Sequence, residues 1–217
     1  SCLPPSVYSY YIPSTCPVLA GRAPFTLSGS GSVASKNVAS GLSVALGSSV
    51  MANGTGVASN HSVTPATLDV TRRPVSLSGT RVYNATTTAS SSDLTTLSNL
   101  VGSDTLALSN SGTIANANVG TDKTITIGSL SLGNGSNGGL GSNYTLSGGT
   151  HTLSVTQRPV TISGTKVYDG TATGSNSSIK TVNNRAGSET LSLPGSGSMG
   201  SAAVGTGTVI TLGTQAL

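Results

Sequence analysis

The residue types that carry most enzyme chemistry are scarce in this chain and lack the spacing that such chemistry needs. The 217 residues include six acids and two histidines, His61 and His151. The acids show no D-x-D-x-D spacing of a tight calcium loop, and neither HExxH nor GxSxG occurs. We therefore expect no catalytic residue, no metal site, no cofactor and no enzyme activity, with both histidines facing solvent from strands. A weak calcium site built from loop carbonyls stays open.

The two cysteines of the chain, Cys2 and Cys16, both lie in its first segment. A metal or redox site would need further ligands or a C-x-x-C spacing, and the sequence offers neither. We predict a disulfide that closes this short loop and contributes about 3 kcal/mol in the loop-entropy model. Such a bridge fits an oxidising compartment.

A long internal repeat positions the remaining candidates. "RPVSLSGTRVYNAT" begins at Arg73, and "RPVTISGTKVYDGT" begins 85 positions later at Arg158. A shift of 81 brings "FTLSGSGSVASKNVASGLSVALG", from Phe25, onto the segment around Leu106. We therefore divide the chain into an amino-terminal segment with the disulfide (1–19), a partial repeat (20–72), a complete repeat (73–157) and a repeat that lacks its last strands (158–217).

Each repeat has the pattern of β-strands. Pairs such as Leu106 and Leu108, or Leu153 and Val155, alternate with Ser, Thr or other small residues, the period of two that places one face inward. Clusters of Gly and Asn separate these runs and suit turns. The best helix candidate is a short one, "SSSDLTTLSNLVG" from Ser90. We predict an all-β fold of tandem, small β-sandwich-like or β-grasp-like repeats of about 85 residues.

Charge and hydropathy exclude two classes of partner. The net charge is +4, but the ten basic residues form no run or stripe, so we expect no nucleic-acid partner. No apolar run approaches the roughly 20 residues that span a bilayer, so we expect no membrane span. The amino end has no basic-then-apolar leader, and any export signal is expected to have been removed or to lie outside this chain.

Tyr83 and Tyr168 occupy equivalent places in two repeats, and Tyr168 is followed by Asp169 and Gly170. The carboxylate could serve as a metal ligand or in a cross-link, but the equivalent Asn84 favours a turn. In a chain with so few aromatic residues, we expect each tyrosine to anchor a small core with its hydroxyl at the rim. The alternative is a ring that stacks on a ligand.

Two phrases together resemble a known class of repeat: "RPVTISGTKVYDGTAT", and "NYTLSGGTHTLSVTQRPVT" from Asn143. They look like the YDG-type and MBG-type repeats of very large secreted bacterial haemagglutinin-like adhesins, over roughly residues 20 to 217. The resemblance implies β-rich extracellular stalk modules, a place outside the bacterium or on its surface, adhesion or biofilm-matrix roles, and no catalysis. The Asn84-Ala85 copy departs from the tyrosine-acid-glycine pattern, which weakens any chemical role for the carboxylate.

The chain ends suggest a second possibility. "SVYSYYI" alternates like a strand, and its residues Val7, Tyr8, Tyr10, Tyr11 and Ile12 could complement the open carboxy-terminal repeat of a neighbouring chain. Alternatively, this segment fills its own first repeat, with Val7-Tyr8 in the role of Val82-Tyr83, or the chain is cut from a longer protein.

Three function classes follow from these observations. The first is an extracellular structural repeat protein, the stalk of an adhesin or a matrix component, whose partners are neighbouring repeats or identical chains and whose host or matrix ligand binds regions outside this chain. The alternative is a self-assembling protomer of an extracellular filament or sheath joined by strand complementation. The third is a carbohydrate-binding module, for which only Tyr8, Tyr10 and Tyr11 form a group of aromatics.

Overall fold

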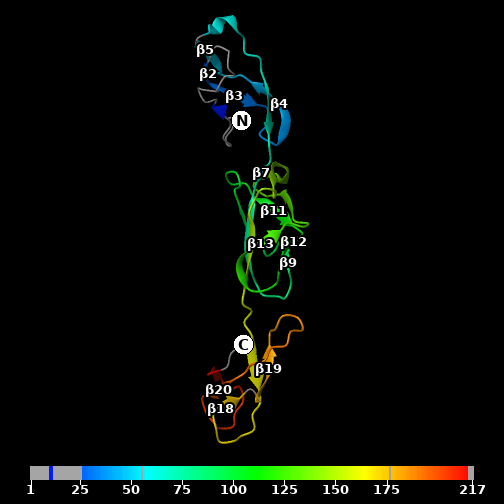
Figure 1. The fold of residues 1–217 in the computed structure, drawn as a ribbon, viewed down its shortest axis with the longest axis vertical. Coiled ribbons are helices and arrows are strands. Elements are labelled where there is room, and N and C mark those ends of the chain that lie inside the picture. The colour runs from blue at the N-terminus through cyan, green and yellow to red at the C-terminus, as the bar shows by residue number, and fades with distance from the viewer. Residues whose placement is uncertain (1–9, 12–25, 55, 176, 215–217) are drawn as a thin grey trace. The chain divides into compact units, whose positions relative to one another are not determined.

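A computed structural model describes residues 10–11, 26–54, 56–175 and 177–214. The predicted all-β fold is confirmed: the described residues form strands and two short 3-10 turns, η1 (Ala58–Asn60) and η2 (Gly141–Asn143) (Figure 1). The best helix candidate, the segment from Ser90, forms no helix: it contains the end of one strand, a turn and another strand. None of the helical segments in the described part of the chain is long and apolar enough to cross a membrane.

The strands fall into three runs along the chain. The first run is β1 (Tyr10–Tyr11), β2 (Thr26–Ser28), β3 (Ser30–Val33), β4 (Ala39–Ala45), β5 (Val50–Ala52) and β6 (Thr67–Val70). The second is β7 (Arg73–Pro74), β8 (Ser76–Val82), β9 (Thr88–Ser90), β10 (Thr96–Ser98), β11 (Leu106–Ser109), β12 (Ser111–Ile114), β13 (Gly120–Thr126), β14 (Ser131–Asn134), β15 (Tyr144–Thr145) and β16 (His151–Thr156). The third is β17 (Thr161–Gly164), β18 (Thr173–Ser175), β19 (Ile179–Asn183), β20 (Ser196–Met199) and β21 (Ile210–Leu212).

The chain divides into two compact units that are discontinuous in sequence. Unit 1 comprises Ser1–Val75, Asn99–Ala107 and Leu132–Gly148, and unit 2 comprises the remaining residues. In unit 1, a four-stranded sheet has the order β1-β3-β4-β6, β2 pairs with β5, and β7 pairs with β15 in parallel.

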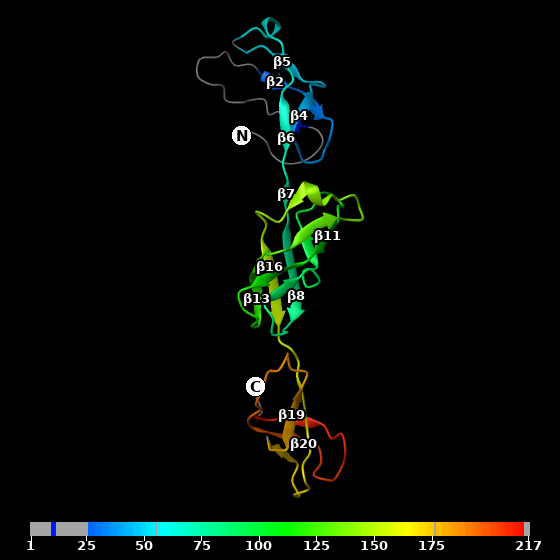
Figure 2. The same cartoon turned by 90° about the vertical axis from the view of Figure 1, so that its right-hand side faces the viewer.

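Unit 2 contains a six-stranded sheet with the order β10-β8-β16-β13-β12-β9. Figure 2 shows β8, β16 and β13 side by side. β16 is parallel to β8 over six residue pairs, from His151 opposite Leu77 to Thr156 opposite Val82, and antiparallel to β13. Alternate residues of β16 are buried, as the period of a strand requires. The centre of the core therefore lies where Leu77, Leu153 and Val155 pack, each at most 2% exposed.

Strands of matching sequence pair in matching ways. β4 pairs with β6 as β13 pairs with β16, and both ladders contain the same irregularity, between Ala39 and Leu42 in one and between Gly120 and Lys123 in the other. Likewise β17 pairs with β19 as β8 pairs with β10, and β18 pairs with β20 as β9 pairs with β12. Equivalent sequence thus produces equivalent backbone pairing wherever both copies are described. The segments 20–72, 73–157 and 158–214 are called below the first, middle and third repeats.

Candidate functional site: an open strand position in the third repeat

At the start of both the middle and the third repeat, an arginine is hydrogen-bonded to an asparagine, and this pair is called below the arginine–asparagine frame. Arg158 donates from Nε to the carbonyl oxygen of Asn184 at 2.7 Å and from Nη2 to Asn184 Oδ1 at 2.8 Å. Asn184 Nδ2 returns a bond to the carbonyl of Pro159 at 2.7 Å. Asn184 has φ of 63°, a left-handed conformation that Asn tolerates better than most residues. This closed set of bonds holds the residues just before β17 against the turn that follows β19.

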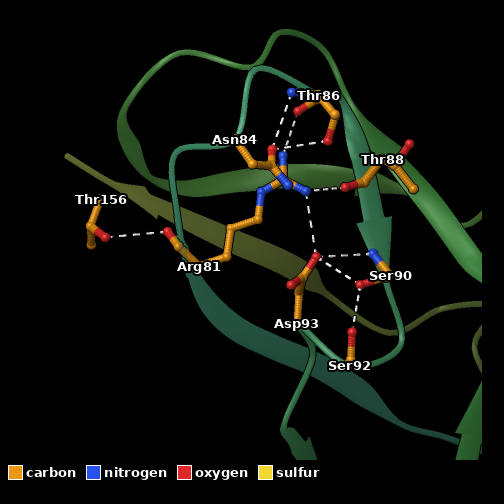
Figure 3. A network of polar contacts seen from close by, with 8 residues as sticks. All are labelled: Arg81, Asn84, Thr86, Thr88, Ser90, Ser92, Asp93 and Thr156. Atoms are coloured by element: carbon orange, nitrogen blue, oxygen red, sulfur yellow. Dashed lines mark hydrogen bonds and ion pairs between the residues drawn. The ribbon is translucent and has the colours of Figure 1, made fainter. Parts of the chain in front are cut away.

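A second cluster holds the loop after β8. Figure 3 shows the Arg81 guanidinium reaching the Thr88 carbonyl and the Asp93 carboxylate. Arg81 also donates to the Thr86 carbonyl, and Asn84 Oδ1 accepts bonds from the Thr86 amide and hydroxyl. Arg81 is only 8% exposed, and these carbonyl and carboxylate acceptors compensate its buried charge through Nη1 and Nη2. Its Nε is buried and has no acceptor among the described residues.

The third repeat holds its matching loop with different residues. Lys166 Nζ lies 2.7 Å from Asp169 Oδ1 and donates to the carbonyls of Thr171 and Thr173. Asp169 Oδ1 accepts bonds from the amide and hydroxyl of Thr171, as Asn84 does in the middle repeat. The hydrogen bond from Lys166 lowers the pKa of Asp169 to about 2, with the Thr171 amide as the next cause. The carboxylate therefore closes a turn.

The middle and third repeats differ in one strand position. β16 lies between β8 and β13 in the middle repeat. In the third repeat, β17 matches β8 but pairs only with β19, and β21 matches β13 but pairs only with β20, as far as the chain is described. The edges of β17 and β21 that correspond to the β16 position therefore have no neighbouring strand there. Open edges of this kind present backbone donors and acceptors that can pair with another strand.

A cavity of about 600 Å³ lies along this open position. Its lining includes Ile162 and Ile210, which match Leu77 and Ile125 of the middle repeat. Leu77 and Ile125 are 1% and 4% exposed, whereas both isoleucines are only half-buried. Val204, on the cavity wall, is 88% exposed. Among the described residues, the apolar side chains at this position are thus only partly covered, whereas β16 covers their counterparts in the middle repeat.

A second cavity, of about 570 Å³, lies beside the first residues of the third repeat. Arg158, Pro159 and Ala186 contribute to its wall, together with Tyr83 and Glu189. The Tyr83 hydroxyl donates to Glu189 Oε1. This hydrogen bond is the main reason that the pKa of Tyr83 is raised above its ordinary value of 10.0, and burial adds to it.

Comparison with known families identifies the repeats. The YDG domain matches the chain twice, over residues 64–154 and 151–217, and together the two matches cover more than half of it. The chain belongs to the YDG domain family. No curated protein and no solved structure matches. The resemblance is thereby confirmed for the YDG type, and the two YDG matches include both cavities.

Several predicted residues of this YDG chain lie outside the described residues: Cys2, Cys16, Val7, Tyr8 and Ile12. The backbone of Tyr10 and Tyr11 is described, and it pairs with Gly31 and Ser30 of β3. In the middle YDG repeat, the matching residues of β12 pair with Ala89 and Ser90 of β9. By register, β1 thus occupies the β9 position of the first repeat.

The other predicted residues differ in how far their side chains are buried. Tyr83 is half-buried, whereas Tyr168 is 66% exposed and lies on the wall of the 600 Å³ cavity. Gly170 has φ of 75° in the turn that Asp169 closes. His61 is exposed, but the expectation that both histidines face solvent is wrong for His151, which is 6% exposed on β16.

Sequence reasoning missed the arginine–asparagine frame. Arg73 and Asn99 make the bonds that Arg158 and Asn184 make, with distances of 2.7 and 2.6 Å. The available signal was their common spacing, since both members recur at a shift of 85 in the two YDG repeats. An asparagine in a loop is common in this composition, so only its position relative to the arginine distinguishes it.

Proposed function

We propose that this YDG-family chain is an extracellular bacterial structural protein, the stalk of an adhesin or a component of a biofilm matrix. Tandem, small β-sandwich-like or β-grasp-like repeats of about 85 residues, of YDG and MBG type, would space a distant binding region from the cell. The role is mechanical and involves no catalysis or cofactor.

The observation that carries this proposal is the parallel pairing of β8 with β16. β8 lies near the start of the middle repeat and β16 near its end, so a pull on the chain draws these neighbouring strands in opposite directions along their length. Their ladder is then loaded in shear, and its hydrogen bonds resist together instead of opening one after another. A repeat built in this way resists tension along the chain, which is the load that a stalk bears.

Force spectroscopy on the full chain, held between two marker domains, tests this role. We expect a distinct unfolding peak with a contour-length gain of about 30 nm, since 85 extended residues span 3.3–3.6 Å each. Gradual extension at low force, without such a peak, contradicts a load-bearing role. Protease treatment of intact source cells tests the location, because a surface protein is cleaved and an internal one is protected.

A second candidate function is a self-assembling protomer of an extracellular filament or sheath. The edges of β17 and β21 that lack a neighbouring strand among the described residues favour it, because such an edge can pair with a strand from another chain. Light scattering and negative-stain microscopy, in oxidising and in reducing buffer, distinguish the two candidates. A stalk stays monomeric at micromolar concentration, whereas a protomer forms concentration-dependent fibres.

A further inference from the structure

We propose that Asn137 is a site of spontaneous modification, at which the folded chain converts this asparagine through a cyclic imide into aspartate and isoaspartate. Three asparagines of the sequence are followed by glycine: Asn53, Asn134 and Asn137. Glycine favours this reaction, because it has no Cβ to hinder the approach of its amide nitrogen to the asparagine side chain. The three asparagines differ in how the fold holds their side chains.

The reaction needs only Asn137, Gly138 and water. The amide nitrogen of Gly138 loses its proton to solvent and forms a bond to Asn137 Cγ. The bond between Cγ and Nδ2 breaks, and Nδ2 takes up a proton and leaves as ammonia. Water then opens the imide ring at one of its two carbonyls, which gives aspartate or isoaspartate. The chain has exchanged ammonia for water, and no oxidant, reductant or cofactor takes part.

Asn137 and Gly138 lie in the exposed part of the loop between β14 and η2. The Asn137 amide donates to Thr105 Oγ1 at 3.2 Å, but the Asn137 side chain makes no hydrogen bond to another described residue. Gly138 has φ of 81°, and a Cβ built on it would meet no atom within 4 Å. The Asn137 carboxamide can therefore rotate toward the Gly138 nitrogen without breaking a contact.

Asn134 lies in the same loop, but its reactive atoms are held. Asn134 Oδ1 accepts a hydrogen bond from the Gly141 amide at 2.9 Å. The amide of Gly135, which would attack, donates to the Gly139 carbonyl at 2.9 Å. A Cβ at Gly135 would lie 1.8 Å from the Thr105 carbonyl oxygen, so this backbone packs closely. The imide ring at Asn134 cannot form until both hydrogen bonds open.

Asn53 is held in the way that Asn134 is held. The two asparagines match at a shift of 81, and Asn53 Oδ1 accepts from the Ala58 amide at 2.6 Å. A loop-closing hydrogen bond thus fixes the side chain at equivalent positions of the first and middle repeats. The residue that matches Asn137 in the first repeat is Gly56. The reactive asparagine is therefore a feature of the middle repeat that its first-repeat counterpart lacks.

The modification changes the charge of the surface and leaves the base of the loop in place. Either product carries a new carboxylate, which lowers the formal net charge by one, from +4 to +3. The hydrogen bond between Gly135 and Gly139 closes the base of the loop, and a Cβ at Gly139 would lie 2.1 Å from the Thr105 carbonyl oxygen. The change is thus confined to residues 136–138, which are exposed.

Peptide mapping by mass spectrometry tests the proposal on the full folded chain. The chain is incubated in mildly alkaline buffer and digested at acid pH, and fragmentation locates each product and separates isoaspartate from aspartate. Asn137 should react at least about tenfold faster than Asn134, whose two hydrogen bonds must open first, and also faster than Asn53. Equal rates at Asn134 and Asn137 overturn the assignment, and so does the absence of isoaspartate at position 137.

The same chain unfolded in concentrated urea is the internal control. Unfolding removes the hydrogen bonds that protect Asn134 and Asn53, while each asparagine keeps its glycine neighbour. The three sites should then react at comparable rates. If Asn137 remains as strongly preferred in urea as in the folded chain, the preference arises from neighbouring sequence and the structural assignment is overturned.

Substitution of Asn137 provides an independent readout. Ion-exchange chromatography of the incubated chain should show an acidic species, and Asn137→Gln should remove it, because glutamine would have to form a larger ring. Asn118→Gln is the matched control, since Asn118 is exposed and is followed by valine; it should leave the acidic species unchanged. Neither side chain is buried, so both variants should fold. Persistence of the species in Asn137→Gln, or its loss in Asn118→Gln, overturns the proposal.

Discussion

Arg158 and Asn184 make the same two hydrogen bonds as Arg73 and Asn99, and in each pair Arg Nε lies 2.7 Å from the Asn carbonyl oxygen. Both asparagines are left-handed, with φ of 63° and 68°. Two copies separated by 85 residues thus share side-chain bonds and backbone conformation. This agreement indicates that the pair is a structural element of the YDG repeat.

Changing either asparagine tests that element. Asn184→Ala should lower the free energy of unfolding by about 2 kcal/mol, because hydrogen bonds are lost and alanine is strained at positive φ. Asn184→Gly loses the same hydrogen bonds but has no strain at positive φ, so it should lower the free energy of unfolding by about half as much. Urea denaturation followed by circular dichroism measures both. Asn137→Ala, at an exposed site outside this element, serves as control, and an equal loss there would count against the assignment.

The glycine of the "SGT" phrase is required by a close backbone approach. A Cβ at Gly79 would lie 1.9 Å from the Asp93 carbonyl oxygen, and one at Gly164 would lie 1.9 Å from that of Ser178. Gly79→Ala and Gly164→Ala should each lower the free energy of unfolding by about 1–3 kcal/mol or more, because the neighbouring backbone would have to move away from the new Cβ. Gly200→Ala, where a Cβ would meet open space, should be nearly neutral in the same urea experiment.

Arg81 should be replaceable by lysine but not by methionine. Arg81→Met removes the donor to two backbone carbonyls and takes the cation away from the Asp93 carboxylate, which keeps its bonds from Ser90. The change should lower the free energy of unfolding by about 2–4 kcal/mol. Arg81→Lys should cost much less, because Lys166 serves the matching loop of the third repeat. Thermal unfolding of the two variants measures the difference, and equal destabilisation would contradict this prediction.

Asp169 should make the stability of the third repeat depend on acid pH. Its pKa is lowered from the ordinary value of 3.8 to about 2, chiefly by the hydrogen bond from Lys166. A lowered pKa stabilises the fold fully above the unfolded value, and this contribution is lost as the pH falls from about 4 to 2. Asp169→Asn, which copies Asn84, should remove this dependence. Urea midpoints measured across that range, or a carboxyl titration by NMR, provide the test.

The Tyr83 hydroxyl should resist ionisation because it donates a hydrogen bond to the Glu189 carboxylate. The pKa of Tyr83 is raised in the folded chain, so its protonated hydroxyl stabilises the fold. This contribution is complete at pH values below the ordinary pKa of 10.0 and is lost as the pH rises through the pKa of the folded state. Absorbance titration of the tyrosinates, compared with Tyr83→Phe, isolates this residue. Glu189→Gln should shift its titration toward lower pH, and an unchanged titration would contradict the bond.

Much of the fold class can be predicted from the residues alone. Alternation such as Leu153 and Val155 is local, and comparison of the sequence with itself reveals the repeat without reference to any contact. The turn at Asp169-Gly170 is also local, because a side chain that bonds two residues ahead needs no distant partner. The helix candidate from Ser90 forms a turn instead, because the Asp93 carboxylate accepts hydrogen bonds from the amide and hydroxyl of Ser90.

Tertiary structure decided which strands are neighbours and which side chains are covered. The alternation of residues along a strand is the same whatever strand lies next to it, so it does not predict the strand order. The position of β16 between β8 and β13 depends on packing and hydrogen bonds between residues that are distant in sequence. That placement buries His151, which is 6% exposed on β16, whereas Tyr168 of the third repeat is 66% exposed. The need for glycine at Gly79 likewise arises only when Asp93 approaches it. Sequence periodicity determined the strands and their repetition, while contacts between distant residues determined the strand order and the core.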